Sequence, residues 1–209
     1  DFRRAVDFST GRWRQEQVRT PTFLTGNPAP QRQIAALDGD IAFNVAPDGA
    51  ATRATAQVAK DRRAELRHSS IGILRAALTP GAKIANPRKH ENHDIVEVTT
   101  PEGDQFTLSI DSTTKLPARV VSMSYNPNLG DVAMETEFSG YADVDGLKLP
   151  TRIVTRLDKY TLADIQVTKN TVNAQVGDLV APAAISGASA AAPAPTVTAE
   201  EVAKGIWFL

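Results

Sequence analysis

The 209-residue sequence contains no cysteine, and aromatic residues make up only 6% of it. Without cysteine, the chain has no disulfide scaffold, no thiol nucleophile and no thiolate zinc site. No apolar run approaches the roughly 18–20 residues that a membrane-spanning helix needs, so we predict no membrane span. Isoleucine, leucine, valine and phenylalanine nevertheless supply 49 residues, or 23% of the chain. Disordered chains usually contain less than about 20% of these residues, so there is enough apolar material for a core.

Charge of one sign is not in excess, because the formal net charge is −1. The two halves differ, however. Residues 1–90 carry 15 basic and 8 acidic side chains, and residues 91–209 carry 8 basic and 16 acidic ones. A basic segment can mark nucleic-acid binding, but this one lacks interleaved aromatic residues and any recognisable motif. We therefore predict no nucleic-acid partner, and we interpret the two halves as facing each other or a neighbouring domain.

Residues 57–78 have the spacing of helices. Apolar side chains recur there at intervals of three and four at Ile71, Leu74 and Leu78. Because Ser69-Ser70 and Gly72 interrupt the middle, we expect two short helices, with Ser70 as the N-cap of the second. Pro80-Gly81 is expected to end that helix.

The remaining patterns are typical of strands. Residues 33–37 and 41–45 flank Asp38-Gly39-Asp40, where Asp-Gly supplies the positive φ of a tight hairpin turn. From residue 93 onward, apolar and polar side chains alternate with a period of two, and residues 94–100 are expected to pair with residues 105–110. The fold class predicted is mainly β (α+β): a curled antiparallel sheet or unclosed half-barrel, with a short helical pair covering one face.

Several motifs occur in a characteristic order. They are Asn128-Leu129-Gly130-Asp131, Phe138-Ser139-Gly140-Tyr141, Asp145-Gly146-Leu147-Lys148-Leu149-Pro150 and Ala203-Lys204-Gly205-Ile206-Trp207-Phe208-Leu209. In this order they resemble the N-terminal region of exported bacterial proteins of the metallo-β-lactamase fold. The resemblance implies a β-rich accessory domain over residues 1–180, an Ala/Pro-rich linker over 181–197, and the start of a truncated zinc domain over 198–209. In that tail, Thr198 and Glu201 form a capping-box pattern for a short helix that Gly205 ends, before a strand at Ile206–Leu209.

The zinc ligands of that family are not found in this chain. The family's site rests on a His-x-His-x-Asp-His run, whereas the histidines here are His68, His90 and His93. Because two-metal hydrolysis needs several histidine and carboxylate ligands, we predict no catalytic residue and no cofactor in these residues. The resemblance implies that zinc belongs to a missing C-terminal hydrolase domain, the expected partner, and that the protein is periplasmic or secreted.

The β-rich region is also similar in outline to periplasmic lipoprotein carriers, whose fold is an unclosed antiparallel barrel with helices over its concave face. In a carrier, the apolar strand face would line a ligand cavity. In an accessory domain, the same face would be a filled core under the helices. The candidate ligand-binding residues on this face are Phe106, Leu108, Ile110, Met123, Met134 and Phe138.

Two polar clusters are weaker candidates. His90 and His93, beside Asp94, have residue types that bind metal ions, although their spacing does not bring side chains together in a loop that enters a strand. Glu135 and Glu137 share one strand face about 6.5–7 Å apart, a separation that suits glycoside hydrolysis.

The ordinary explanation for the two glutamates is structural. Arg152 and Arg156 alternate in the same way on a later strand, so cross-strand ion pairs with Glu135 and Glu137 are expected. Such exposed pairs contribute about 0.2–1 kcal/mol each.

The sequence leaves three functions open. The first is a non-catalytic accessory domain that shapes the substrate cleft of a zinc hydrolase or mediates its assembly. The second is a periplasmic module that binds lipid or another apolar ligand. The third is an independent enzyme built on the glutamate pair or the histidine loop.

Overall fold

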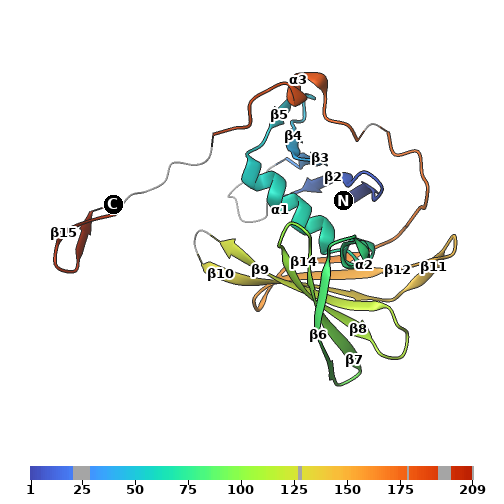
Figure 1. Ribbon diagram of the computed structural model, residues 1–209. Coiled ribbons are helices and arrows are strands. Elements are labelled where there is room, and N and C mark those ends of the chain that lie inside the picture. Colours follow the sequence, from blue (N-terminus) through green and yellow to red (C-terminus); the bar gives the residue numbers. More distant parts are fainter. Residues whose placement is uncertain (21–28, 127–128, 178, 193–198, 209) are drawn as a thin grey trace. The chain divides into compact units, whose positions relative to one another are not determined.

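The computed structural model describes residues 1–20, 29–126, 129–177, 179–192 and 199–208. It divides into two compact units (Figure 1). The first unit comprises Asp1–Asp61 with Leu179–Leu209, and the second unit comprises Arg62–Asp178. Strands dominate both, so the predicted mainly β class is confirmed. Two units with separate cores replace the single domain predicted for residues 1–180. The sequence carries no linker signal at their boundary because it falls inside a helix, α1 (Ala56–Arg67).

The first unit holds a five-stranded antiparallel meander in which each strand pairs with the next along the chain. The expected hairpin at Asp38-Gly39-Asp40 is confirmed, and Gly39 has a φ of +59°. Trp13, Leu37 and Phe43 are buried in its core. The strands are β1 (Phe2–Asp7), β2 (Arg12–Arg19), β3 (Gln31–Asp38), β4 (Ile41–Val45) and β5 (Ala51–Arg53). No element before residue 31 is predicted from the sequence, and the structure shows β1 and β2 within residues 1–20.

The chain returns to this unit after residue 178. Leu179, Ala181 and Ile185 are 4–7% exposed, and the short helix α3 (Ala183–Ser186) packs against β4 and β5. The prediction of a linker from residue 181 is therefore wrong for residues 181–188. Few apolar anchors are enough here, because Ala181 and Ile185 pack directly on Ala36 and Phe43. Residues 193–197 of the predicted linker lie outside the described residues.

One carboxylate fastens the returning segment to the sheet. Asp38 accepts a hydrogen bond from the backbone N–H of Ala181 at 2.9 Å and another from Nε of Arg12 at 2.6 Å. Burial acts to raise the pKa of Asp38, but the hydrogen bonds from Arg12 and Ala181 outweigh it and hold this pKa below its ordinary value. The ionised carboxylate is thus the form that the fold stabilises.

Replacing Asp38 with alanine is expected to lower the free energy of unfolding of the first unit by about 1–3 kcal/mol, because two donors lose their acceptor. Urea denaturation followed by the fluorescence of Trp13, in a Trp207→Phe background, measures this. Asp48→Ala is the matched control, since Asp48 is an exposed turn carboxylate that accepts from the N–H of Ala50. Equal losses in the two variants would contradict a fastening role for Asp38.

The tail forms a hairpin rather than the expected short helix. β15 (Glu200–Ala203) pairs with β16 (Ile206–Phe208), and among the described residues it pairs with no other strand. The expected strand after Gly205 is confirmed up to Phe208, whereas Thr198 and Leu209 lie outside the described residues. The capping-box reading fails at Glu201, whose carboxylate instead accepts from the N–H of Gly205 across the turn at 2.8 Å.

The second unit is a seven-stranded antiparallel sheet with the order β14-β13-β10-β9-β8-β7-β6. β6 and β14 are its two edges, so the sheet is open, as predicted. The expected pairing of residues 94–100 with 105–110 is confirmed. The strands are β6 (Lys83–His90), β7 (His93–Thr99), β8 (Gln105–Asp111), β9 (Pro117–Asn126), β10 (Gly130–Ser139), β13 (Arg152–Leu157) and β14 (Tyr160–Gln166); β11 (Ala142–Val144) and β12 (Leu147–Leu149) form a separate small hairpin.

The second helix, α2 (Ser70–Leu78), packs on one face of this sheet, against β7 and β9 (Figure 1). The two expected short helices are confirmed, but the N-cap is Ser69 rather than Ser70: its Oγ accepts from the N–H of Gly72 at 3.0 Å. A Cβ atom on Gly72 would collide with the carbonyl oxygen of Leu66, so the tight junction between the helices needs glycine. Within the described residues, no helix is both long enough and apolar enough to cross a membrane.

Candidate functional site

Most of the predicted ligand-binding residues share the sheet face under α2. In antiparallel pairs, directly opposed residues point to the same side, and Leu108 is opposite Val120, which is opposite Thr136. Alternation along β8 and β10 then adds the rest. The residues that this register places on the helix-covered face are Phe106, Leu108, Ile110, Met134 and Phe138.

Met123 is a correction to that set. Val121 is opposite Thr107, so Val121 and Met123 point to the other face, and Met123 is 67% exposed. The strand has apolar residues in both phases, Val120 in one and Val121 with Met123 in the other. Val121, Met123 and Tyr125 are the longer apolar series of this strand, but they do not form its buried face, because Val120 packs in the core under α2.

On the helix-covered face, the apolar side chains beneath α2 are buried, and those farther from α2 are less buried. Phe106, Leu108 and Phe138 are 2–5% exposed and pack with Ile73 of α2. Toward β13 and β14 the apolar side chains of this face are only half-buried. Cross-strand neighbours there are Met134 with Leu157, and Ile153 with Ile165.

A buried histidine joins the helices to the sheet. His68, between α1 and α2, places Nε2 2.8 Å from Oγ of Ser122 and Nδ1 3.2 Å from Oγ1 of Thr136. Its ring meets that of Phe106 edge-on, with centroids 5.8 Å apart. Burial lowers the pKa of His68 from 6.5 to about 4, so the imidazole is neutral at neutral pH. No pattern in the sequence indicates this role, because the immediate neighbours of His68, Arg67 and Ser69, are polar.

The His68–Ser122 contact has the distance of a nucleophile and base but not their chemistry. A general base must hold the proton that it takes, and a pKa of about 4 makes His68 a weak base at neutral pH. Its second nitrogen contacts the neutral hydroxyl of Thr136 rather than a carboxylate that would stabilise an imidazolium ion. The arrangement is suited to holding helix and sheet together.

The opposite face carries the glutamate and arginine pairs. Nη1 of Arg156 lies 3.1 Å from Glu135 and 2.7 Å from Glu137, which confirms the expected cross-strand pairing for Arg156. Arg119 is a second partner of Glu135, at 3.3 Å. Arg152 instead pairs with Asp164, at 2.8 Å. Both glutamates are therefore bound to guanidinium groups, but these belong to Arg156 and Arg119 rather than to the predicted Arg156 and Arg152.

The two candidate histidines face each other across a hairpin. His90 at the end of β6 is opposite His93 at the start of β7, with Glu91 in a left-handed conformation between them. Asp94 points to the other face and pairs with Lys89 and Lys115. The predicted set of two histidines and Asp94 is thus not brought together. Among the described residues, no group of three or more histidine, aspartate or glutamate side chains is arranged to hold a metal ion.

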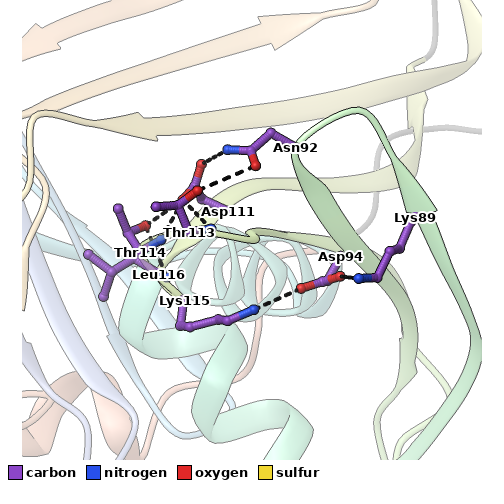
Figure 2. A network of polar contacts seen from close by, with 8 residues as sticks. All are labelled: Lys89, Asn92, Asp94, Asp111, Thr113, Thr114, Lys115 and Leu116. Atoms are coloured by element: carbon purple, nitrogen blue, oxygen red, sulfur yellow. Dashed lines mark hydrogen bonds and ion pairs between the residues drawn. The ribbon is translucent and has the colours of Figure 1, made fainter.

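A network of polar contacts fixes this hairpin against the turn between β8 and β9 (Figure 2). Asp111 accepts from the backbone N–H of Thr114 and of Thr113, and from Nδ2 of Asn92 at 2.8 Å. Hydrogen bonds from Thr114 hold the pKa of Asp111 below its usual value. The turn that carries the two histidines is therefore held in place by several bonds.

A cavity of about 420 Å³ opens beside that hairpin. It lies on the face opposite α2, since Arg119, Glu137 and Val154 are directly opposed in the register and all line it. The polar side chains around it come from the hairpin and from β9, β10 and β13. The charged and histidine residues of the lining are His90, Glu91, His93, Arg119, Glu137, Arg152 and Arg156.

No family model matches the chain, and no curated protein sequence matches it. Among solved structures, the chain is similar to the LolA superfamily protein NE2245 from Nitrosomonas europaea. The match has 14% sequence identity, covers 78% of this chain and 77% of that chain, and has a TM-score of 0.39. A similarity of this size does not bear on ligand or activity.

Proposed function

We propose that the chain is a non-catalytic binding module for an apolar ligand, held on the helix-covered face of the seven-stranded sheet. The observation that carries this proposal is the half-buried apolar strip beside α2, which consists of Met134, Ile153, Leu157 and Ile165. The strip continues the filled core formed by Phe106, Leu108, Ile110 and Phe138, so a ligand lying on it would extend that core.

The dimensions of the helix support this proposal. α2 has nine residues, which is about 13 Å of helix, whereas six strand spacings across the sheet span about 29 Å. One such helix cannot cover the whole face. Apolar surface left beside it gains about 25 cal/mol for each Å² that a ligand removes from water.

The polar contacts on the two faces of the sheet support a stable platform rather than a reactive centre. His68 binds two hydroxyl groups and is a weak base, and Glu135 and Glu137 are bound to arginines. A binding module needs this kind of fixed framework, since ordering a loose one on binding would reduce affinity.

Replacing Met134 with lysine is expected to reduce the binding of N-phenyl-1-naphthylamine, an uncharged fluorescent probe, by about tenfold or more, because an ammonium group would enter the apolar strip. Fluorescence titration measures the affinity. Met123→Lys is the matched control: it makes the same change on the neighbouring strand and the opposite face, where the side chain is 67% exposed. Circular dichroism checks that both variants fold, and Ile165→Lys, on the edge strand, replaces Met134→Lys if that variant does not.

Two results would refute the proposed site. One is the absence of saturable probe binding to the unaltered chain. The other is an equal loss of binding in the Met134 and Met123 variants. Native mass spectrometry of the purified chain supplies an independent readout, since a bound lipid adds a mass that mild denaturation removes.

The second candidate is the accessory domain of a periplasmic or secreted zinc hydrolase. The observation in its favour is the tail hairpin, where Val202, Ile206 and Trp207 are 58–61% exposed and would suit burial against a neighbouring domain. In this proposal zinc and catalysis belong to that domain. Sequencing the reading frame onward tests it: a His-x-His-x-Asp-His run, together with zinc in the longer purified product, is expected. A frame without such a run would eliminate this candidate.

A further inference from the structure

The cavity on the face opposite α2 is a second place where a ligand fits, and it does not depend on the apolar strip. Its volume of about 420 Å³ falls in the range of pockets for small molecules. Three of its charged lining residues are arginines and two are glutamates. One of these glutamates, Glu91, is exposed at the hairpin turn, which leaves Glu137 as the carboxylate on the strands that form the cavity.

The arginines keep hydrogen-bonding capacity for another acceptor. In the described part of the chain, Arg119 and Arg156 make their contacts with the glutamates through Nη1 alone. Their side chains are 40% and 31% exposed, so they are neither buried nor fully solvated. A guanidinium group has five N–H donors in a fork that matches carboxylate and phosphate oxygens.

The glutamates hold these donors in position. Arg156 is placed between Glu135 and Glu137, and Arg119 is bound to Glu135 from the other side. Arg152 is held by two bonds to Asp164, at 3.0 and 2.8 Å. Pairs arranged in this way fix the guanidinium planes before a ligand arrives, which reduces the entropy that binding must overcome.

A buried hydroxyl on the same face is the second observation. Ser109 is directly opposite Arg119 in the register, is 2% exposed, and its Oγ has no partner among the described residues. Unpaired buried hydroxyl groups are uncommon in folded proteins and cost free energy. Ser109 is not among the residues that line the cavity, so a polar ligand would have to reach past Arg119 to give this hydroxyl a partner.

We infer that this cavity binds a small organic anion through a carboxylate or phosphate group, with Arg119, Arg152 and Arg156 as the donors. The imidazoles of His90 and His93 lie at its hairpin side, where the network around Asp111 fixes the turn (Figure 2). Val154 and Ala118 give the lining an apolar part for the carbon skeleton of the ligand. The anion site and the apolar site are on opposite faces of one sheet, so either can exist without the other.

Calorimetric titration of the whole chain with phenyl phosphate is expected to show one saturable site, with weaker binding of inorganic phosphate. Replacing Arg152 with glutamine is expected to weaken phenyl phosphate binding by about tenfold, because one of the three guanidinium groups at the cavity is lost. Arg88→Gln is the matched control. It also breaks one exposed ion pair at the surface of this sheet, to Glu97 at 3.1 Å, but Arg88 does not line the cavity. The affinity of the Arg88→Gln variant for phenyl phosphate is expected to stay within about twofold of that of the unaltered chain.

A vesicle-binding experiment distinguishes the two possible sources of the anionic group, a lipid headgroup and a free small anion. Vesicles of phosphatidylglycerol that bind the chain through Arg152, together with weaker binding of phenyl phosphate, would assign the site to a lipid headgroup; the reverse would assign it to a free small anion. Either result supports an anion site. Absence of saturable binding in the millimolar range by both probes would overturn it, as would equal losses in the Arg152 and Arg88 variants. If Arg152→Gln fails to fold, Arg119→Gln makes the same test.

Discussion

Replacing Phe106 with alanine is expected to lower the free energy of unfolding of the second unit by about 3–5 kcal/mol. Phe106 is 3% exposed, packs in one cluster with Ile73 of α2 and with Val120, and meets the ring of His68 edge-on. Its removal leaves a cavity between helix and sheet. The unfolding transition, followed by far-ultraviolet circular dichroism, measures this loss of stability.

The distribution of aromatic residues allows the two units to be followed separately. All three tyrosines, Tyr125, Tyr141 and Tyr160, belong to the second unit, whereas Trp13 belongs to the core of the first. In a Trp207→Phe background, Phe106→Ala should change the tyrosine transition far more than the tryptophan transition. Tyr125→Ala is the control, since Tyr125 is 75% exposed and should cost about 0.5 kcal/mol or less. Comparable losses in the two variants would show that Phe106 is not part of a packed core.

Acid is expected to destabilise the second unit through His68 before most carboxylates protonate. The pKa of His68 is about 4 in the folded chain, whereas the unfolded chain has the ordinary histidine value of 6.5. Below pH 6.5 the unfolded chain therefore takes up a proton that the folded chain does not, and stability falls as the pH drops toward 4. Below about pH 4 both states are protonated and this loss is complete, at about 3 kcal/mol.

Urea denaturation at a series of pH values between 7 and 4, for the unaltered chain and for His68→Gln, measures this loss. Glutamine keeps one donor and one acceptor for Ser122 and Thr136 but does not titrate in this range. The difference in stability between the two proteins should therefore shrink or reverse as the pH falls. A difference that stays constant with pH would mean that His68 is not buried as a neutral group.

Much of the fold can be predicted from the pattern of the sequence, since strand alternation and hairpin turns are local signals. Asp38-Gly39-Asp40 and the alternation from Phe106 to Ile110 each predict a strand pairing that the structure contains. The segment at 181–188 is different. Its alanine content predicts a linker, and only contacts with β4 and β5, far away in sequence, explain its burial. Long-range packing of this kind leaves no period in the sequence.

The candidate site was harder to predict, because it depends on the phase of each strand and on distant neighbours. Val120 and Val121 are both apolar, so the sequence allows either face of β9 to be buried, and Met123 was placed on the wrong one. The sequence singled out His90, Glu137 and Arg156 separately. That they line one cavity follows from the order of the strands, which residue spacing does not encode.

The return of the chain to the first unit has a consequence for synthesis. Residues 62–178, which form the whole second unit, are inserted between the strands of the first unit and the segment that completes its core. On the ribosome, β1 to β5 emerge early, yet Leu179, Ala181 and Ile185 arrive only after all 117 residues of the second unit, residues 62–178. The second unit can therefore fold while the first is still unfinished. A chain released before residue 179 would keep one complete core and leave the other open, exposing apolar surface of the kind that leads to aggregation and degradation.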